Sequence, residues 1–257
     1  MKANNTNLIN SIQQHGLYNY SYEHDSCGVG LVAHIKGVPS HSILRSGIEV
    51  LRKLGHRGAS GADPDTGDGA GVLVQMPHEF LIKHSGPIGD LIGEKGEYAV
   101  GVAFLPSESE SRNTCEQIID KIIVENGMRF LGWRDVPINP SSIGKLAQSV
   151  MPVIKQFFVE RPTHIQNEAR FELKLYVIRK QIERTVNSQG IAIGSDFYIP
   201  SFSSNRLVYK GLLKSAQLDM FYEDLKNSSM KTPFALVHSR FSTNTLGTWN
   251  LAHPYRY

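Results

Sequence analysis

Residues 26–33 read SCGVGLVA, and here a polar leader gives way to the first apolar segment of the chain. From Val29 to Ile35 every second residue is apolar, which is typical of a β-strand with one buried face. Cys27 stands at the junction, and the glycines that follow it let another backbone or a ligand approach closely. A single cysteine in front of a strand is more often structural than catalytic. The junction therefore predicts where the fold begins but does not by itself assign a function.

Apolar runs and stripes elsewhere predict a single domain of mixed elements. Strands are expected over Val72–Met76, Tyr98–Leu105, Phe130–Val136, Val153–Val159 and Phe234–Val237, with a hairpin between Phe197–Ile199 and Leu207–Tyr209. Helices are expected to start at Ser40 and Ser107, to cover about 141–150 and 214–225, and to include the stripe from Phe171 to Ile182. Strands outnumber a strict alternation with helices, and neighbouring strands look hairpin-linked. The pattern therefore favours a layered α+β fold with antiparallel sheets over a doubly wound fold.

The composition argues against several classes of protein. The 257 residues are 40% hydrophobic and 20% charged, as in a soluble globular chain, and the formal net charge is only +3. The chain contains no run of five like charges, so no nucleic-acid partner is expected. No apolar stretch reaches the roughly 18 residues that span a bilayer, so no membrane partner is expected either. The leader lacks the apolar core of a signal peptide, and we expect a cytoplasmic protein.

Metal and nucleotide sites are not indicated. Two cysteines rule out a disulfide scaffold and a cysteine-based zinc finger, and ten histidines show no metal-ligand spacing, so no metal is expected. Cys115 lies on the apolar stripe of a predicted helix and is expected in the core. Gly28–Ala33 matches a dinucleotide-binding pattern, but that pattern should open a helix and here it lies within a strand. Asp63–Gly69 resembles a calcium loop, but Gly67 and Val74 stand where oxygen ligands are needed.

Four separated motifs strengthen the case that Cys27 is functional. They are SCGVG at 26–30, HRGA at 56–59 with AD at 62–63, TGDGAG at 66–71, and HSRFSTNT at 238–245 with Trp249 and Pro254 beyond. Together and in this order they resemble the glutaminase domain, a class II glutamine amidotransferase, at the N-terminus of the glutamate synthase large subunit. The resemblance runs from about Tyr22 to Tyr257 with a variable middle, in which Tyr209-Lys210-Gly211 also looks similar.

The resemblance implies an N-terminal-nucleophile hydrolase, an α+β four-layer αββα sandwich whose catalytic cysteine is the first residue of the mature chain. We therefore expect residues 1–26 to be a propeptide and residues 27–257 to form the amidotransferase domain. A thiol has an ordinary pKa near 8.5, whereas an α-amino group, at about 7.7–8.0, can act as a base near neutrality. Because the nitrogen of Cys27 is an amide while Ser26 is attached, this chemistry requires that the Ser26–Cys27 bond be cut.

The same resemblance implies roles for three further residues. Arg240 would bind the α-carboxylate of L-glutamine, because a planar guanidinium pairs bidentately with a carboxylate, and Thr243 would help to hold the same end. Arg57 would lie near the nucleophile. From the residues alone, Arg240 could be a surface salt-bridge partner, and Arg57 could equally be a cation at a helix C-terminus. Asp68, which lies between glycines, is expected to be loop architecture.

The resemblance also implies that part of the site is missing. Family members carry a His-Asn-Gly-Glu segment shortly after a Pro-x-Arg that residues 254–256 match, and its Asn side chain and Gly amide form the oxyanion hole. The Asp that binds the substrate amino group lies further on. The sequence stops at Tyr257, so we expect a fragment, incomplete at the C-terminus and inactive alone, since one lost oxyanion donor typically costs ~10²–10³ in rate.

No cofactor is expected in this fragment. FMN and an iron–sulfur cluster would belong, by resemblance, to later domains of the full-length protein. The remaining synthase domains would be partners of this one, and the resemblance allows for a small reductase subunit as well.

The leading hypothesis is hydrolysis of L-glutamine to L-glutamate and ammonia through a γ-glutamyl thioester on Cys27. In the full-length enzyme the ammonia would serve glutamate synthesis from 2-oxoglutarate. One alternative is another cysteine N-terminal-nucleophile amidohydrolase with a different amide substrate. The other is a truncated, non-catalytic interaction module.

Overall fold

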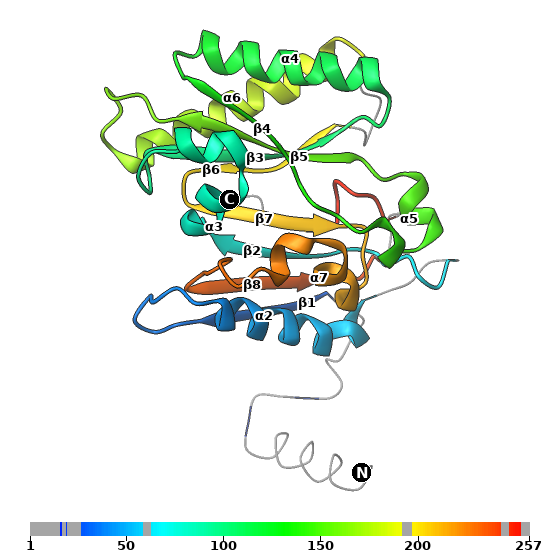
Figure 1. Ribbon diagram of the computed structural model, residues 1–257. Coiled ribbons are helices and arrows are strands. Elements are labelled where there is room, and N and C mark those ends of the chain that lie inside the picture. The colour runs from blue at the N-terminus through cyan, green and yellow to red at the C-terminus, as the bar shows by residue number, and fades with distance from the viewer. Residues whose placement is uncertain are drawn as a thin grey trace, which may run out of the picture.

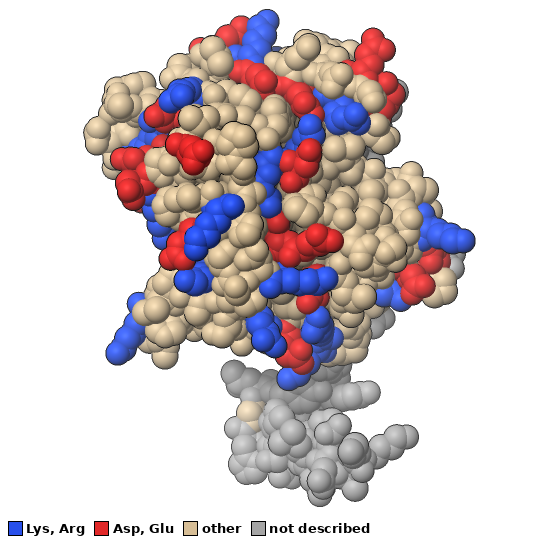
Figure 2. All heavy atoms as spheres, in the orientation of Figure 1, with Lys and Arg blue, Asp and Glu red and all other residues tan. Residues whose placement is uncertain are grey.

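The computed structural model describes residues 16, 19, 27–58, 63–191, 197–242 and 247–252 (Figure 1). Apart from two positions, the predicted propeptide lies outside the described residues, as do Thr243 and residues 253–257. Within the described part, no helix is long and apolar enough to cross a membrane. Figure 2 shows Lys and Arg interspersed with Asp and Glu over one face, in keeping with the small net charge.

Four strands form the first sheet, in the order β1-β8-β2-β7, and every neighbouring pair is antiparallel. They are β1 (Gly28–Ala33), β2 (Ala70–Gln75), β7 (Arg206–Gly211) and β8 (Phe234–Ser239). β1 and β8 are the first and last of the described strands along the chain, yet they lie side by side. Strand β1 ends at Ala33 rather than continuing to Ile35, whose side chain is fully exposed.

The second sheet has the order β4-β5-β3-β6 and is also antiparallel throughout. Its strands are β3 (Tyr98–Leu105), β4 (Phe130–Asp135), β5 (Val153–Glu160) and β6 (Tyr198–Ser203). Two long helices, α4 (Ser109–Glu125) and α6 (Glu168–Ser188), pack together against this sheet, at the top of Figure 1. Cys115 is buried between α4 and the sheet, as expected from its place on the apolar stripe. The expected α+β class with antiparallel sheets is confirmed.

Helix α2 (His41–Lys53) lies against β8 and β1 of the first sheet (Figure 1). Its N-cap is Ser40, whose Oγ accepts a hydrogen bond from the backbone N–H of Ile43 at 3.4 Å. A Cβ on Gly47 would lie 2.5 Å from the Cβ of Ala235, so a glycine is needed for this close approach. The 3₁₀ helix η2 (Leu54–Arg57) continues α2 and carries the chain to the end of β1 where Cys27 lies.

The remaining helical elements are short. They are α3 (His78–His84), α5 (Lys145–Ser149) and α7 (Leu218–Phe221), and the 3₁₀ helices η3 (Gly86–Leu91), η4 (Pro140–Ser142), η5 (Ser215–Gln217) and η6 (Glu223–Lys226). The helices predicted over about 141–150 and 214–225 are therefore each broken. The first is interrupted because Ile143 and Gly144 are extended and Gly144 packs against the Asp63–Thr66 turn. The second is interrupted at Tyr222, which is extended and bridges to Ile138.

The hairpin predicted between β6 and β7 is wrong. β6 pairs with β3 in the second sheet, whereas β7 pairs with β2 in the first, so the polar turn between them carries the chain from one sheet to the other. Glu172 of α6 fixes this corner, because its carboxylate accepts hydrogen bonds from Ser203 Oγ and from Ser204 N and Oγ at 2.6–2.9 Å. Among the described strands, β4 and β5 alone are consecutive and paired, and η4 and α5 separate them, so the expectation of hairpin links is also wrong.

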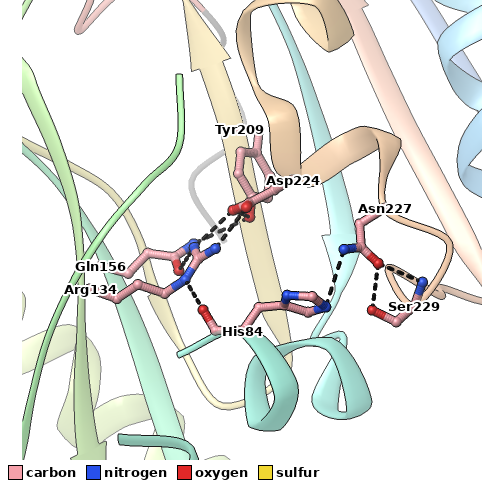
Figure 3. Close-up of polar contacts among 7 residues, drawn as sticks. All are labelled: His84, Arg134, Gln156, Tyr209, Asp224, Asn227 and Ser229. Atoms are coloured by element: carbon pink, nitrogen blue, oxygen red, sulfur yellow. Dashed lines mark hydrogen bonds and ion pairs between the residues drawn. The ribbon is translucent and has the colours of Figure 1, made fainter. Parts of the chain in front are cut away.

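A buried polar network joins the two sheets (Figure 3). Arg134 of β4 forms a bidentate pair with Asp224 of η6 at 2.7 and 2.8 Å, and the two side chains are only 7% and 4% exposed. Tyr209 of β7 donates its hydroxyl to Asp224 at 2.8 Å, and Gln156 of β5 accepts from Arg134 at 2.8 Å. The Nε of Arg134 donates to the backbone carbonyl of His84 at 2.8 Å. Burial raises the pKa of Tyr209 well above its ordinary value, so the phenol keeps its proton.

This network predicts a large stability difference between two substitutions. Asp224→Ala should lower the free energy of unfolding by about 3–5 kcal/mol, because it leaves the Arg134 guanidinium buried without its carboxylate. Glu160→Ala removes the surface pair Arg129–Glu160, whose side chains are 62% and 48% exposed, and should cost less than about 1 kcal/mol. Denaturant unfolding of both variants gives the comparison, and equal losses would contradict a role for the network in joining the sheets.

Candidate active site

Cys27 lies exposed at the start of β1, beside the chain that leaves β8. The backbone N–H of Phe241 donates to its Sγ at 3.4 Å, and the thiol is 3.7 Å from the carbonyl oxygen of the same residue. This proximity follows from the strand pairing, since Gly28 stands opposite Ser239 and antiparallel strands bring the start of one to the end of the other. The first and the fourth motif of the sequence therefore meet at one end of the first sheet.

The third motif lies on the other side of β8. Ala70 pairs with Ser239, and the backbone N–H of Arg240 donates to the carbonyl oxygen of Gly69 at 2.8 Å. The carboxylate of Asp68 accepts from the backbone N–H of Ser242 at 2.6 Å. Gly69 has φ +140°, and a Cβ there would lie 2.5 Å from the carbonyl oxygen of Ala252, so this position requires glycine.

The second motif reaches the site through η2. A Cβ on Gly28 would lie 3.0 Å from the Cβ of Leu54 and 3.2 Å from that of Arg57, so β1 and η2 are in close contact directly after Cys27. A Cβ on Gly58 would lie 2.9 Å from Ser239 Oγ. Arg57 therefore stands beside the start of β1, and residues 59–62 lie outside the described residues.

Arg240 follows β8 directly and borders a cavity of about 280 Å³. Its guanidinium donates to the carbonyl oxygen of Asp68 at 3.3 Å. Asp68, Lys214 and Ser239 also line the cavity, and Ser215 donates its hydroxyl to Ser239 at 2.7 Å. The fold thus brings Cys27, Arg57 and Arg240 to the same end of the first sheet, whereas Thr243 lies outside the described residues.

His238 is a buried histidine of β8, opposite Val29 of β1. Burial, together with the charges of Arg240 and Lys210, lowers its pKa to about 4. The imidazole is therefore neutral at neutral pH and is a weak base. Lys210 lies in β7, and Gly71 of β2 stands between it and His238. Its Nζ donates to the carbonyl oxygen of Asn250 at 2.6 Å and lies 4.3 Å from the centroid of the Tyr198 ring.

Sequence reasoning missed two contributors to the surroundings of the thiol. Phe241 contacts Cys27 through its main chain, which leaves no side-chain signal in a sequence. Asp68 was expected only to shape a loop, but its carboxylate binds the segment that contacts the thiol. The sequence did offer one signal for Asp68: it is a charged residue between two glycines, in a motif whose next residues form a strand paired with β8. Within the described residues, no group of three or more His, Cys, Asp or Glu side chains is arranged to hold a metal ion.

Comparisons with known proteins give one consistent result. The family model described as "Glutamine amidotransferases class-II" matches residues 27–257. The chain is 47% identical over 242 residues to the "Glutamate synthase [NADPH] large chain" of Bacillus subtilis (strain 168), covering 94% of this chain and 16% of that protein. It is 42% identical over 240 residues to the protein of the same name from Azospirillum brasilense, covering 93% and 16%.

A plant relative carries a different electron donor in its name. The chain is 37% identical over 235 residues to "Ferredoxin-dependent glutamate synthase 1, chloroplastic/mitochondrial" of Arabidopsis thaliana, covering 91% of this chain and 14% of that protein. The chain thus spans about a sixth or less of the length of these relatives. The match begins at Cys27, and the motifs that carried the resemblance meet around that residue, so the resemblance is confirmed. This chain belongs to the class II glutamine amidotransferase family.

Proposed function

We propose that this chain is the glutaminase unit of a glutamate synthase and hydrolyses L-glutamine to L-glutamate and ammonia. One observation carries the proposal: four motifs separated in sequence converge at one end of the first sheet, around the Sγ of Cys27. An exposed cysteine, with a cavity bordered by an arginine at the same end of the sheet, suits attack on the amide of a substrate that also carries a carboxylate.

The chemistry needs a base for the thiol. His238 is poorly suited, because an imidazole with a pKa of about 4 holds a proton weakly at neutral pH. The α-amino group of Cys27 itself, once freed by cleavage after Ser26, has the appropriate basicity and stands on the same residue. Residues 1–26 are accordingly a propeptide in this proposal. The family match that begins at Cys27 supports it.

The reaction then proceeds in two halves. The amine takes the thiol proton, and the sulfur attacks the side-chain amide carbon of glutamine to give a tetrahedral intermediate. The C–N bond breaks, the ammonium form of the base returns a proton, and ammonia leaves a γ-glutamyl thioester. Water attacks the thioester with the same amine as base, the C–S bond breaks, and glutamate and the free thiol are released. The sum is glutamine plus water giving glutamate plus ammonia.

Three residues have binding roles in this proposal. Arg240 pairs with the α-carboxylate of glutamine, Thr243 holds the same end, and Arg57 of η2 binds substrate near the nucleophile. The position of Arg240 at the border of the cavity, and that of Arg57 beside Gly28, support these assignments. Arg240 is suited to the task because its fork matches a carboxylate.

The whole protein is proposed to be a cytoplasmic oxidoreductase of the N-terminal-nucleophile type with further synthase domains. Its glutaminase unit would be a four-layer sandwich, which the helices packed on the two sheets support. Ammonia would pass to 2-oxoglutarate in those domains, with FMN and an iron–sulfur cluster held there and a small reductase subunit as partner. The two cysteines of this chain, one buried and one exposed, do not supply the four thiolates that a cluster takes.

The first prediction concerns the N-terminus. Intact-mass measurement of the full-length protein should show that the active chain begins at Cys27, because an amide nitrogen cannot serve as the base. A glutaminase assay on the same sample is the control. A preparation that retains Met1 on every chain and still has full glutaminase activity would contradict the proposed base.

The second prediction separates glutamine from other amides. In the full-length protein, Arg240→Ala should raise the KM for glutamine by about 10²-fold or more, because two charge-assisted hydrogen bonds are lost. Arg240→Lys should give a smaller rise, since the charge stays and the fork is lost. Arg129→Ala, on the surface, is the control and should leave KM unchanged. An unchanged KM in Arg240→Ala would favour an amidohydrolase with another substrate, and no turnover in a processed wild-type protein would favour a non-catalytic module.

A further inference from the structure

Asp68 holds the chain segment that lies against the nucleophile. The main chain of Phe241 contacts Cys27 through two successive peptide groups. The N–H of Phe241, in the Arg240–Phe241 peptide, donates to Cys27 Sγ at 3.4 Å, and the carbonyl oxygen of Phe241, in the next peptide, accepts from the thiol at 3.7 Å. The residues on both sides of Phe241 are bonded to one short loop. Arg240 donates its N–H to Gly69 at 2.8 Å, and Ser242 donates its N–H to the Asp68 carboxylate at 2.6 Å.

The hydrogen bond from the Ser242 N–H to the Asp68 carboxylate is charge-assisted. A bond from a peptide N–H to an ionised carboxylate is shorter and stronger than one between neutral groups, and 2.6 Å is short for a nitrogen donor. The hydrogen bond from the Arg240 N–H to the Gly69 carbonyl oxygen continues the pairing of β2 with β8. The Arg240–Phe241 peptide, whose N–H faces the sulfur, therefore lies between two fixed neighbours: the sheet holds the peptide before it, and the Asp68 carboxylate holds the peptide after it.

The loop that carries Asp68 is itself held in place. A Cβ on Gly67 would lie 2.5 Å from the backbone of Leu213 and Lys214, so the loop packs against that segment. Asp63 accepts hydrogen bonds from Thr66 Oγ1 at 2.8 Å and from the N–H of Leu146 in α5 at 3.0 Å, which ties the start of the loop to α5. Asp68 therefore extends from a rigid support, as a positioning group must.

We infer that Asp68 is a positioning residue for Cys27, acting through the main chain of Phe241 and Ser242; this rests on the proposed glutaminase function. An N–H directed at sulfur stabilises the thiolate that attacks the amide. The Asp68 carboxylate holds that N–H in place by fixing the next residue. The carbonyl oxygen of Asp68, which a side-chain substitution leaves intact, accepts from Arg240, so the binding end of the site is retained when the carboxylate is removed.

The test compares two readouts in the full-length protein: the rate at which iodoacetamide alkylates Cys27, followed by peptide mass, and glutamine turnover. Cys115 does not interfere, because burial, with a smaller contribution from Glu116, raises the pKa of its thiol to about 11. Asp68→Ala should slow alkylation and lower kcat by about 10- to 100-fold, since misplacement by about 1 Å can cost that much, with KM within about threefold of wild type.

Two further variants complete the design. Asp68→Asn keeps an oxygen acceptor without the charge, and it should recover most of the lost rate, to within about tenfold of wild type. Asp65→Ala is the matched control, because it removes a carboxylate from the same loop that is 78% exposed and pairs with Lys214 at 3.5 Å. It should behave like wild type in both readouts. Thermal unfolding shows whether each variant folds. If Asp68→Ala does not fold, the comparison of Asp68→Asn with Asp65→Ala tests the positioning role.

The outcomes separate this inference from the proposed function. If Asp68→Ala and Asp68→Asn, both folded, match Asp65→Ala in alkylation and in kcat, the positioning role is overturned. A raised KM at unchanged kcat overturns it too, because Asp68 would then act on substrate binding. If the processed wild-type protein shows no glutamine turnover but Asp68→Ala still slows alkylation of Cys27, the proposed function fails and the positioning role stands.

Discussion

Strand β8 forms hydrogen bonds along both edges, with β1 on one side and β2 on the other, and every part of the site depends on this double pairing. Ser239 pairs with Gly28 in one direction and with Ala70 in the other, so the three strands end at the same level. Cys27, Asp68 and Arg240 each lie one or two positions beyond those pairs. Backbone hydrogen bonds that close such distant contacts are costly in chain entropy, and the buried side chains of the first sheet offset that cost.

Close approach of backbones is the second constraint. Gly47 lets α2 settle on Ala235, and Gly28 lets η2 settle on the start of β1. Both contacts would be crowded by a Cβ, at 2.5 Å and 3.0 Å respectively. Gly28, next to Cys27, is therefore explained by the packing of η2 against the sheet, without any bound nucleotide. It also lets Arg57 stand beside the start of β1, because a side chain at this position would crowd η2.

Local patterns in the sequence predicted most elements but not how they pair. Tyr98–Leu105 was predicted to the residue, since a continuous apolar run between turns has few other interpretations. The β6–β7 turn looked like a hairpin because its polar residues resemble a tight turn, whereas Glu172, far away in sequence, holds it as a corner between sheets. The long-range contact that distinguishes the two cases has no local signal.

The site shows the same division. Cys27, Arg57 and Arg240 could be named from motifs, since the roles proposed for them belong to their side chains. Phe241 contacts the thiol through its main chain, and any residue with a backbone N–H could stand there, so the sequence offered no reason to select it. Asp68 was named but assigned to loop shape, because its partner is a backbone N–H that becomes visible only once β8 lies beside β2.

In the proposed function, charge at the end of the first sheet bears on both the base that activates the thiol and the substrate that binds. Arg240 and Lys210 lower the pKa of His238 after burial has already done so, because a second positive charge is unfavourable beside them. Arg240, which borders the cavity at this end of the sheet, also favours an anion there, such as the carboxylate of the proposed substrate. An environment that attracts the carboxylate of an amino acid is therefore one in which a histidine is a poor base. A cysteine at the N-terminus avoids this conflict, because its own α-amino group can serve as the base and no imidazole beside the cations is needed.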